Sequence, residues 1–251
     1  MIRFENIYKK FGKLEVLNDI SIRFDIGQSI AIVGPNGSGK TTLIKILLGM
    51  VLPDKGKLFF EDKNIFQTHA YRGNIGYMPQ ISRYPPNLKI RQLIEMMTEI
   101  RKSEGWNGDI DEDLYEAFEL DKIKNKPMGT LSGGTSQKVG AALAFRFNPK
   151  VLILDEPTAG LDPIAAEILK DKIQKERAKG KLVIITSHIV SDLEELTDYM
   201  LYMQETRVHF FKKIDDLKDQ YGGEKLGKII AFLMKKKAYN TLETILSKVK
   251  Q

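Results

Sequence analysis

The apolar residues of this chain recur with two periods, which predict strands and helices in turn. Every second residue is apolar over much of the first 30 positions, as expected for strands. Short apolar runs suit further strands at 30–33, 57–61, 74–78, 151–154, 182–185 and 199–203. Helical spacing follows most of these runs, at 43–48, 137–145, 164–178 and 192–196. Strands that alternate with helices predict an α/β fold with a parallel sheet covered on both faces.

Two stretches depart from this alternation. Over about 82–135 the apolar residues keep helical spacing without a strand, so we expect an inserted helical subdomain whose two helices flank a loop over 102–113. Residues 226–249 predict one or two amphipathic helices, which could dock on the body, on a partner or on a membrane. The expected division is a main domain over 1–210 and a helical tail over 211–251.

The stretch from Gly34 to Thr42 has the pattern G-x-x-x-x-G-K-T and is the most specific motif of the sequence. It lies between an apolar run and a predicted helix, as a phosphate-binding loop does. Glycines let backbone N–H groups turn toward phosphate oxygens, and the helix N-terminus adds a favourable dipole. Lys40 can reach the β- and γ-phosphates, and the Thr41 hydroxyl can ligate Mg²⁺. The predicted nucleoside triphosphate site contains Gly34, Pro35, Asn36, Gly37, Ser38, Gly39, Lys40, Thr41 and Thr42.

Four polar residues follow predicted strands, where open α/β sheets form their nucleotide sites. Asp155 ends an apolar run and can hold Mg²⁺, and Glu156 beside it can orient and deprotonate an attacking water. Gln80 can contact the metal or that water, and His188 can sense a γ-phosphate. We therefore expect catalytic roles for Glu156, His188 and Gln80, and Mg²⁺ ligands at Thr41, Gln80 and Asp155.

A second candidate for anion binding is L-S-G-G-T at 131–135, with Ser132 as a possible helix cap. The chain already has one phosphate loop. A second phosphate-binding element is useful if it completes the site of another copy. This predicts a head-to-tail dimer with two ATP molecules at its interface, which nucleotide closes and hydrolysis opens.

Positive charge is concentrated in the predicted tail. The net charge is +6, and residues 211–251 hold ten lysines against five acidic residues, which leaves about +1 for 1–210. This balance disfavours a nucleic-acid-binding body, and the tail suits either a solvated helix face or an anionic membrane surface. The sequence has no cysteine, no signal-peptide pattern and no apolar stretch near the ~20 residues of a membrane span, which is compatible with the cytosol.

The order of these motifs resembles that of the ATP-binding cassette (ABC) ATPases. The resemblance covers about residues 1–210 and depends on GPNGSGKTT (34–42), Gln80, LSGGT (131–135), VLILDE (151–156), AGLD (159–162) and His188. It implies a P-loop NTPase (RecA-like) core with an N-terminal antiparallel β subdomain and an inserted helical subdomain. The implied cofactors are ATP and Mg²⁺.

The resemblance also implies roles for single residues. Phe11, which by sequence alone could equally be a core aromatic, would stack on adenine beside Val16. Glu156 would be the catalytic base, His188 the switch histidine, and Gln80 the reporter of nucleotide state to membrane subunits. The γ-phosphate of the other protomer would be contacted by Ser132, Gly133, Gly134 and Thr135, and Asp162 would link the two sites across the dimer. Thr135 stands where the family usually has Gln, but the Ser-Gly-Gly core is intact, so we expect hydrolysis.

Single-cassette chains with DEPTAGLDP (155–163) resemble the ATPase subunits of ABC-2-type exporters. Within them, residues 76–97 are similar to the NosF-like ATPases of nitrous-oxide-reductase maturation. The expected protein is a homodimer, or a paired ATPase, held by integral membrane permease subunits on the cytoplasmic face of the membrane, with no nucleic-acid partner. A soluble ABC ATPase that is not coupled to transport is the alternative. A P-loop GTPase is disfavoured, because 125–128 lacks the Asp of N-K-x-D.

Overall fold

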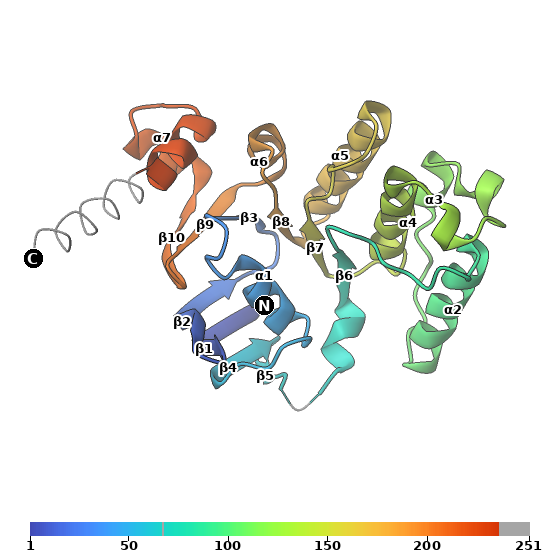
Figure 1. Cartoon of the computed structure of the whole chain (residues 1–251), viewed down its shortest axis with the longest axis horizontal. Helices are drawn as coiled ribbons and strands as arrows, with labels where there is room; N and C mark the ends of the chain where they lie inside the picture. Colours follow the sequence, from blue (N-terminus) through green and yellow to red (C-terminus); the bar gives the residue numbers. More distant parts are fainter. Residues whose placement is uncertain (67, 236–251) are drawn as a thin grey trace, which may run out of the picture.

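Two β-sheets form the frame of the molecule (Figure 1). The structure is a computed structural model that describes residues 1–66 and 68–235. The smaller, antiparallel sheet has the order β2-β1-β4-β5. Its strands are β1 (Ile2–Phe11), β2 (Leu14–Phe24), β4 (Lys55–Phe60) and β5 (Lys63–Asn64). The antiparallel N-terminal subdomain is therefore confirmed.

The larger sheet has the order β10-β9-β3-β8-β7-β6, and every neighbouring pair except β10–β9 is parallel. Its strands are β3 (Ser29–Val33), β6 (Ile75–Met78), β7 (Val151–Asp155), β8 (Leu182–Thr186), β9 (Tyr199–Gln204) and β10 (Arg207–Lys213). The buried apolar runs of the sequence thus form the parallel strands as predicted, since strands covered on both faces need no polar side. The antiparallel strand β10 was not predicted.

Helices pack on both faces of this sheet and beyond its edge at β6 (Figure 1). They are α1 (Lys40–Leu47), α2 (Ile90–Ser103), α3 (Asp113–Ala117), α4 (Gly133–Phe145), α5 (Pro163–Ala178), α6 (Val190–Leu196) and α7 (Ile214–Gln220). Three 3₁₀ turns accompany them, η1 (Ala70–Asn74), η2 (Leu120–Ile123) and η3 (Met128–Thr130). Figure 1 shows α2, α3 and α4 gathered at one end of the molecule, beyond β6.

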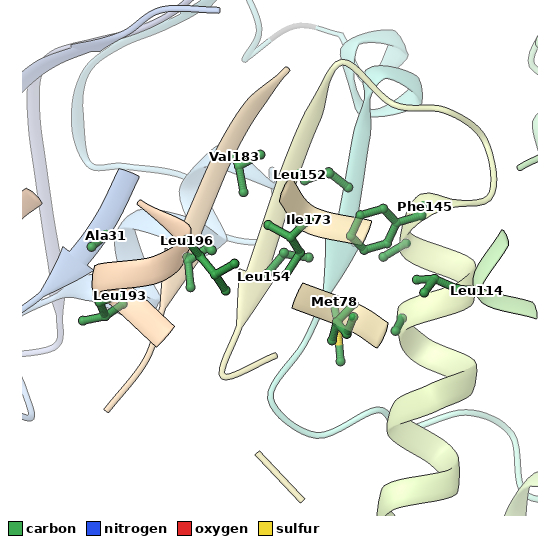
Figure 2. Packing of buried hydrophobic residues seen from close by; sticks show 14 of the residues in the cluster. Ala31, Met78, Leu114, Phe145, Leu152, Leu154, Ile173, Val183, Leu193 and Leu196 are labelled. Carbon is green, nitrogen blue, oxygen red and sulfur yellow. The ribbon is translucent and has the colours of Figure 1, made fainter. Parts of the chain in front are cut away.

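Alternate residues of each parallel strand enter two different cores. In β7, Val151 and Ile153 pack with α1 and the smaller sheet, whereas Leu152 and Leu154 pack with the helices of the opposite face. Figure 2 shows the second core, in which Leu152 and Leu154 of β7 lie beside Ile173 of α5. Burial of each such side chain contributes about 1.5–3 kcal/mol, so these two clusters hold the sheet between its layers.

Two sequence-based expectations differ from the structure. The second helix of the 82–135 block is short, because Glu119 adopts a left-handed conformation (φ 52°) that separates α3 from η2. The strand expected at 57–61 begins and ends earlier, because β4 covers Lys55–Phe60. The division expected at residue 210 stays a prediction; this residue lies within β10, whose edge pairing with β9 the periodicity of the sequence did not reveal. Residues 226–235 are helical, and the rest of the helical segment predicted to 249 lies outside the described residues.

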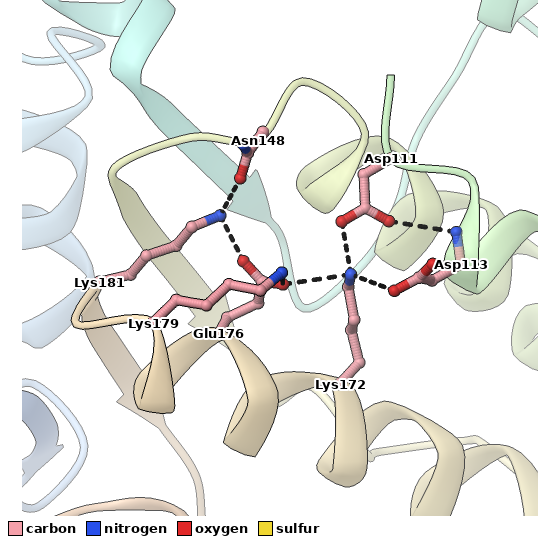
Figure 3. A network of polar contacts seen from close by, with 7 residues as sticks. All are labelled: Asp111, Asp113, Asn148, Lys172, Glu176, Lys179 and Lys181. Atoms are coloured by element: carbon pink, nitrogen blue, oxygen red, sulfur yellow. Dashed lines mark hydrogen bonds and ion pairs between the residues drawn. The ribbon is translucent and has the colours of Figure 1, made fainter. Parts of the chain in front are cut away.

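A buried ion-pair network joins α5 to Asp111 and to Asp113 at the start of α3 (Figure 3). Lys172 of α5 is 3% exposed, and its Nζ contacts Asp111, Asp113 Oδ2 (2.7 Å) and Glu176 Oε1 (3.2 Å). Glu176 is fully buried, and its carboxylate also forms ion pairs with Lys179, at 2.7 Å, and with Lys181. Burial lowers the pKa of Lys172, but the hydrogen bonds to the two aspartates outweigh this and raise it above its ordinary value. The network therefore connects the helical region over about 82–135 to α5, which packs on the sheet.

Candidate active site

A pocket of about 670 Å³ opens at the carboxyl ends of the parallel strands. Residues from distant parts of the sequence line it: Phe11, Leu14, Glu15, Val16, Asn36, Gly37, Ser38, Gly39, Lys40, Thr41, Thr42, Gln80, Asp155, Glu156, Thr186 and His188. Every residue predicted to bind the nucleotide within one chain is in this set except Gly34 and Pro35. The pocket has the position expected for a ligand site in an open α/β sheet.

The phosphate loop joins β3 to α1 and requires glycine at two places. A Cβ on Gly34 would lie 2.0 Å from the backbone oxygen of Met203. Gly39 has φ 103°, and a Cβ there would lie 2.7 Å from the backbone oxygen of Val16. Because neither approach leaves room for a side chain, these glycines pack the loop tightly against β9 and β2.

Lys40 begins α1 and bends back over the loop. Its Nζ donates to the backbone oxygens of Gly34 (2.7 Å) and Pro35 (3.2 Å). Burial lowers the pKa of Lys40, and the nearby charges of Glu156 and Asp155 partly offset this effect. The ammonium group is therefore held in the pocket by two carbonyl groups that a phosphate oxygen can replace.

The carboxylates follow β7 and face the end of β8. Asp155 accepts a hydrogen bond from the Thr186 hydroxyl. Glu156 is buried and has a left-handed conformation (φ 53°), which is unusual for a residue with a Cβ. Its Oε2 accepts from the backbone N–H of His188 at 3.2 Å, and its Oε1 lies 3.6 Å from His188 Nε2. The two residues thus sit side by side, and the His188 side chain, which lines the pocket, is 67% exposed.

Oxygen donors suitable for a divalent cation line the same pocket. They are the Thr41 hydroxyl, the Gln80 amide oxygen and the Asp155 carboxylate. Among the described residues, no cluster of three or more His, Cys, Asp or Glu side chains forms a metal cage. This donor set fits Mg²⁺, which is usually bound through one or two carboxylates together with phosphate oxygens and water.

Gln80 is tied to α4 through its backbone. Its backbone oxygen accepts from Gln137 Nε2 at 3.0 Å, and Gln137 Oε1 accepts from the Ser82 hydroxyl at 2.9 Å. Gln137 is buried and lies one turn into the helix that begins at Gly133. The segment that carries Gln80 is therefore coupled to the start of α4.

The predicted in-trans residues do not line this pocket. Ser132 caps α4, because its Oγ accepts from the Thr135 N–H at 3.2 Å, and the Thr135 hydroxyl lies 2.8 Å from the same oxygen. Ser132 and Gly133 are exposed. Asp162 caps α5 by accepting from the Ala165 N–H at 2.9 Å, and an ion pair joins it to Lys138 of α4 at 2.7 Å.

Three lining residues were not predicted: Leu14, Glu15 and Thr186. Leu14 and Glu15 begin β2, which folds over the phosphate loop, and no local pattern reveals that approach. Thr186 could have been found, because it ends a buried strand at the same edge as Asp155.

The fold and this pocket together define a phosphate-loop nucleoside triphosphatase. Residues 17–159 match the family described as ABC transporter. The chain is 32% identical over 215 residues to the lantibiotic transport ATP-binding protein SrtF of Streptococcus pyogenes, covering 86% of this chain and 92% of that protein. It is 34% identical over 209 residues to the Nod factor export ATP-binding protein I of Burkholderia lata, covering 82% of this chain and 68% of that protein. The chain belongs to the ABC transporter family, and it is an ATP-binding cassette ATPase.

Solved structures agree with this assignment. An ATP-binding subunit of an ABC transporter superposes with a TM-score of 0.84 at 25% identity, covering 93% of this chain and 99% of that one. The fold alone is shared with the dimeric, ADP- and phosphate-bound cassette MJ0796, at a TM-score of 0.73 and 24% identity over 85% of this chain and 99% of that one. No helix among residues 1–66 and 68–235 is long and apolar enough to cross a membrane.

Proposed function

We propose that this chain is the energising subunit of an exporter and works as a pair of cassettes bound to integral membrane subunits. The observation that carries the proposal is the incompleteness of the pocket. It contains the phosphate loop, Glu156 and His188 of one chain, whereas Ser132 and Gly133 lie exposed outside it. Two copies packed head to tail would bring each exposed signature to the pocket of the other copy.

In the proposed reaction a water attacks the γ-phosphorus of ATP, and Glu156 accepts a proton from that water. The bond between the γ-phosphorus and the β–γ bridging oxygen breaks, which yields ADP and phosphate. Lys40 offsets charge on the β- and γ-phosphates, and His188 contacts the γ-phosphate. Phe11, half exposed at the pocket rim, and Val16 receive the adenine. Glu156 and His188 already lie in contact, so a movement of either residue changes its distance to the other.

Mg²⁺ fits the oxygen donors of the pocket, and we propose that Thr41, Gln80 and Asp155 hold it directly or through water. When bound, the ion neutralises charge on the phosphates. The hydrogen bond between Asp155 and Thr186 supports this role, because it fixes the carboxylate at the strand end.

We propose a location on the cytoplasmic face of the membrane, through permease subunits. The names of the relatives, lantibiotic transport and Nod factor export, support outward transport and leave the cargo of this chain open. The similarity of residues 76–97 to NosF-like ATPases stays a prediction, as do the division at residue 210 and the role of Asp162 between the two sites.

The decisive experiment for the catalytic assignment is Glu156→Gln in the full chain. We expect this variant to bind ATP, to form a stable dimer with it and to lose hydrolysis, because the amide cannot accept the proton. Glu167→Gln, an exposed change on α5, is the matched control and should keep the wild-type rate. A wild-type rate in Glu156→Gln would remove Glu156 as the base. Co-purification with an integral membrane protein tests coupling to transport, and a wholly unattached protein would favour an ATPase that is not coupled to transport.

A further inference from the structure

Residues 226–235 form a helix whose apolar side is buried against α6. Leu226, Ile229 and Ile230 are 0%, 1% and 7% exposed. They belong to the same cluster as Leu193 and Leu196 of α6. The segment is thus an integral part of the core on this face of the sheet.

Behind the active site lies a second cavity of about 150 Å³. Ile230 and Met234 form part of its wall, together with Val190 and Leu193 of α6. It shares further lining residues with the nucleotide pocket, namely Lys40, Glu156, Thr186 and His188. The helix over 226–235 therefore reaches the back of the catalytic residues, although it is distant from them in sequence.

The same helix also fixes the element that follows His188. The backbone N–H of Leu226 donates to Glu194 Oε1 at 3.1 Å, and Lys218 Nζ lies 3.6 Å from that oxygen. Gly227 packs against the side chain of Val190, the first residue of α6. Polar and apolar contacts thus hold α6 against this segment at Val190 and Glu194.

Few contacts hold His188 on the side that faces the nucleotide pocket. Its side chain is largely exposed, and its contacts with Glu156 are one backbone hydrogen bond of 3.2 Å and an approach of 3.6 Å. The position of this residue consequently depends on the packing of α6, because its chain enters that helix directly.

We propose that Ile230 and Met234 are positioning residues for ATP hydrolysis. They close the cavity behind Glu156 and His188 and keep α6 in place, so the two catalytic groups stay in contact. Truncation of either side chain enlarges the cavity and lets the His188 segment retreat. This inference rests on the proposed roles of Glu156 and His188. It gives the segment after α7 a function in the reaction.

The test uses Ile230→Ala and Met234→Ala in the full chain, with steady-state ATPase rates and thermal melting. We expect kcat to fall about tenfold or more in Ile230→Ala, since a misplacement of about 1 Å can cost roughly a hundredfold. KM for ATP should change less than about threefold, because the phosphate loop is untouched. Met234→Ala, at a half-buried position, should show the same pattern with a smaller loss of melting temperature. Met234→Leu should restore the rate, since it keeps the side-chain volume.

Ile229→Ala is the matched control, because Ile229 is more buried on the same helix but does not line the cavity. It should lower the melting temperature at least as much as Ile230→Ala and leave kcat of the folded protein near the wild-type value. The proposal would be overturned if Ile229→Ala and Ile230→Ala lowered kcat equally. It would also be overturned if Ile230→Ala and Met234→Ala both kept kcat within about twofold of the wild-type value. Either result leaves the ATPase function standing if Glu156→Gln is inactive, whereas an active Glu156→Gln removes the proposed catalytic roles and this inference with them.

Discussion

Replacing Glu176 by Gln should destabilise the protein by about 3 kcal/mol near neutral pH. The carboxylate is fully buried at the centre of the network that joins α5 to Asp111 and Asp113 (Figure 3). Burial alone would raise its pKa, but hydrogen bonds from Lys179 and Lys181 and the charges of Lys181 and Lys172 outweigh this and lower it from 4.5 to about 2. A tenfold change in the protonation equilibrium is worth about 1.4 kcal/mol, so the lowered pKa corresponds to about 3 kcal/mol.

The pH dependence follows from the direction of this pKa change. Glu176 has a lower pKa in the folded than in the unfolded state, so its stabilisation is fully present above about pH 4.5. Below that value the unfolded chain takes up the proton first, and the stabilisation is lost progressively toward about pH 2. The difference between wild type and Glu176→Gln should therefore shrink from about 3 kcal/mol near neutral pH to about 2 kcal/mol near pH 3.5.

Urea unfolding and thermal melting at several pH values measure this difference. For a chain of this length the loss corresponds to a fall in Tm of roughly 6–12 °C near neutral pH. Glu167→Gln on the same helix is the control, because Glu167 is 68% exposed and its pair with Lys170 should contribute less than about 1 kcal/mol. A Glu176→Gln variant within about 0.5 kcal/mol of wild type, or a difference that does not change with pH, would refute the reasoning.

Three further changes test the phosphate loop and the dimer contact. Lys40→Met should weaken ATP binding about tenfold to a hundredfold, because it removes a charged hydrogen-bond donor; calorimetric titration measures the Kd, and a change below about twofold would contradict this. Gly34→Ala should lower the free energy of unfolding by about 1–3 kcal/mol and lower the affinity for ATP, since the new Cβ would lie 2.0 Å from the Met203 backbone oxygen. An unchanged melting curve would show that the loop accommodates the methyl group. Asp162→Ala should lower the free energy of unfolding by about 1 kcal/mol, because the Ala165 N–H loses its cap. It should also weaken ATP-dependent dimerisation, which light scattering measures. Dimerisation as strong as in wild type would exclude Asp162 from the interface.

Local patterns determined much of this protein. The G-x-x-x-x-G-K-T motif contains its own loop geometry and helix start, so the place of Lys40 in the pocket follows from the local sequence alone. The apolar runs identified the parallel strands, because a strand covered on both faces must be apolar throughout. Asp155, Glu156 and His188 could be placed at one edge, because the ends of parallel strands meet there.

The tertiary structure determined the features that depend on contacts between segments far apart in the sequence. The strand that begins at Leu14 folds over the phosphate loop, and β10 pairs along the edge of β9, although neither contact has a local sequence signal. Lys172 and Glu176 resemble an ordinary exposed helix pair in the sequence, yet both are buried, and Lys172 forms ion pairs with Asp111 and Asp113 of a distant segment. Ile230 has the periodicity of any amphipathic helix, and only packing brings it to the wall behind Glu156. Periodicity specifies which face of an element is apolar; which surface covers that face depends on the complementarity of the whole core.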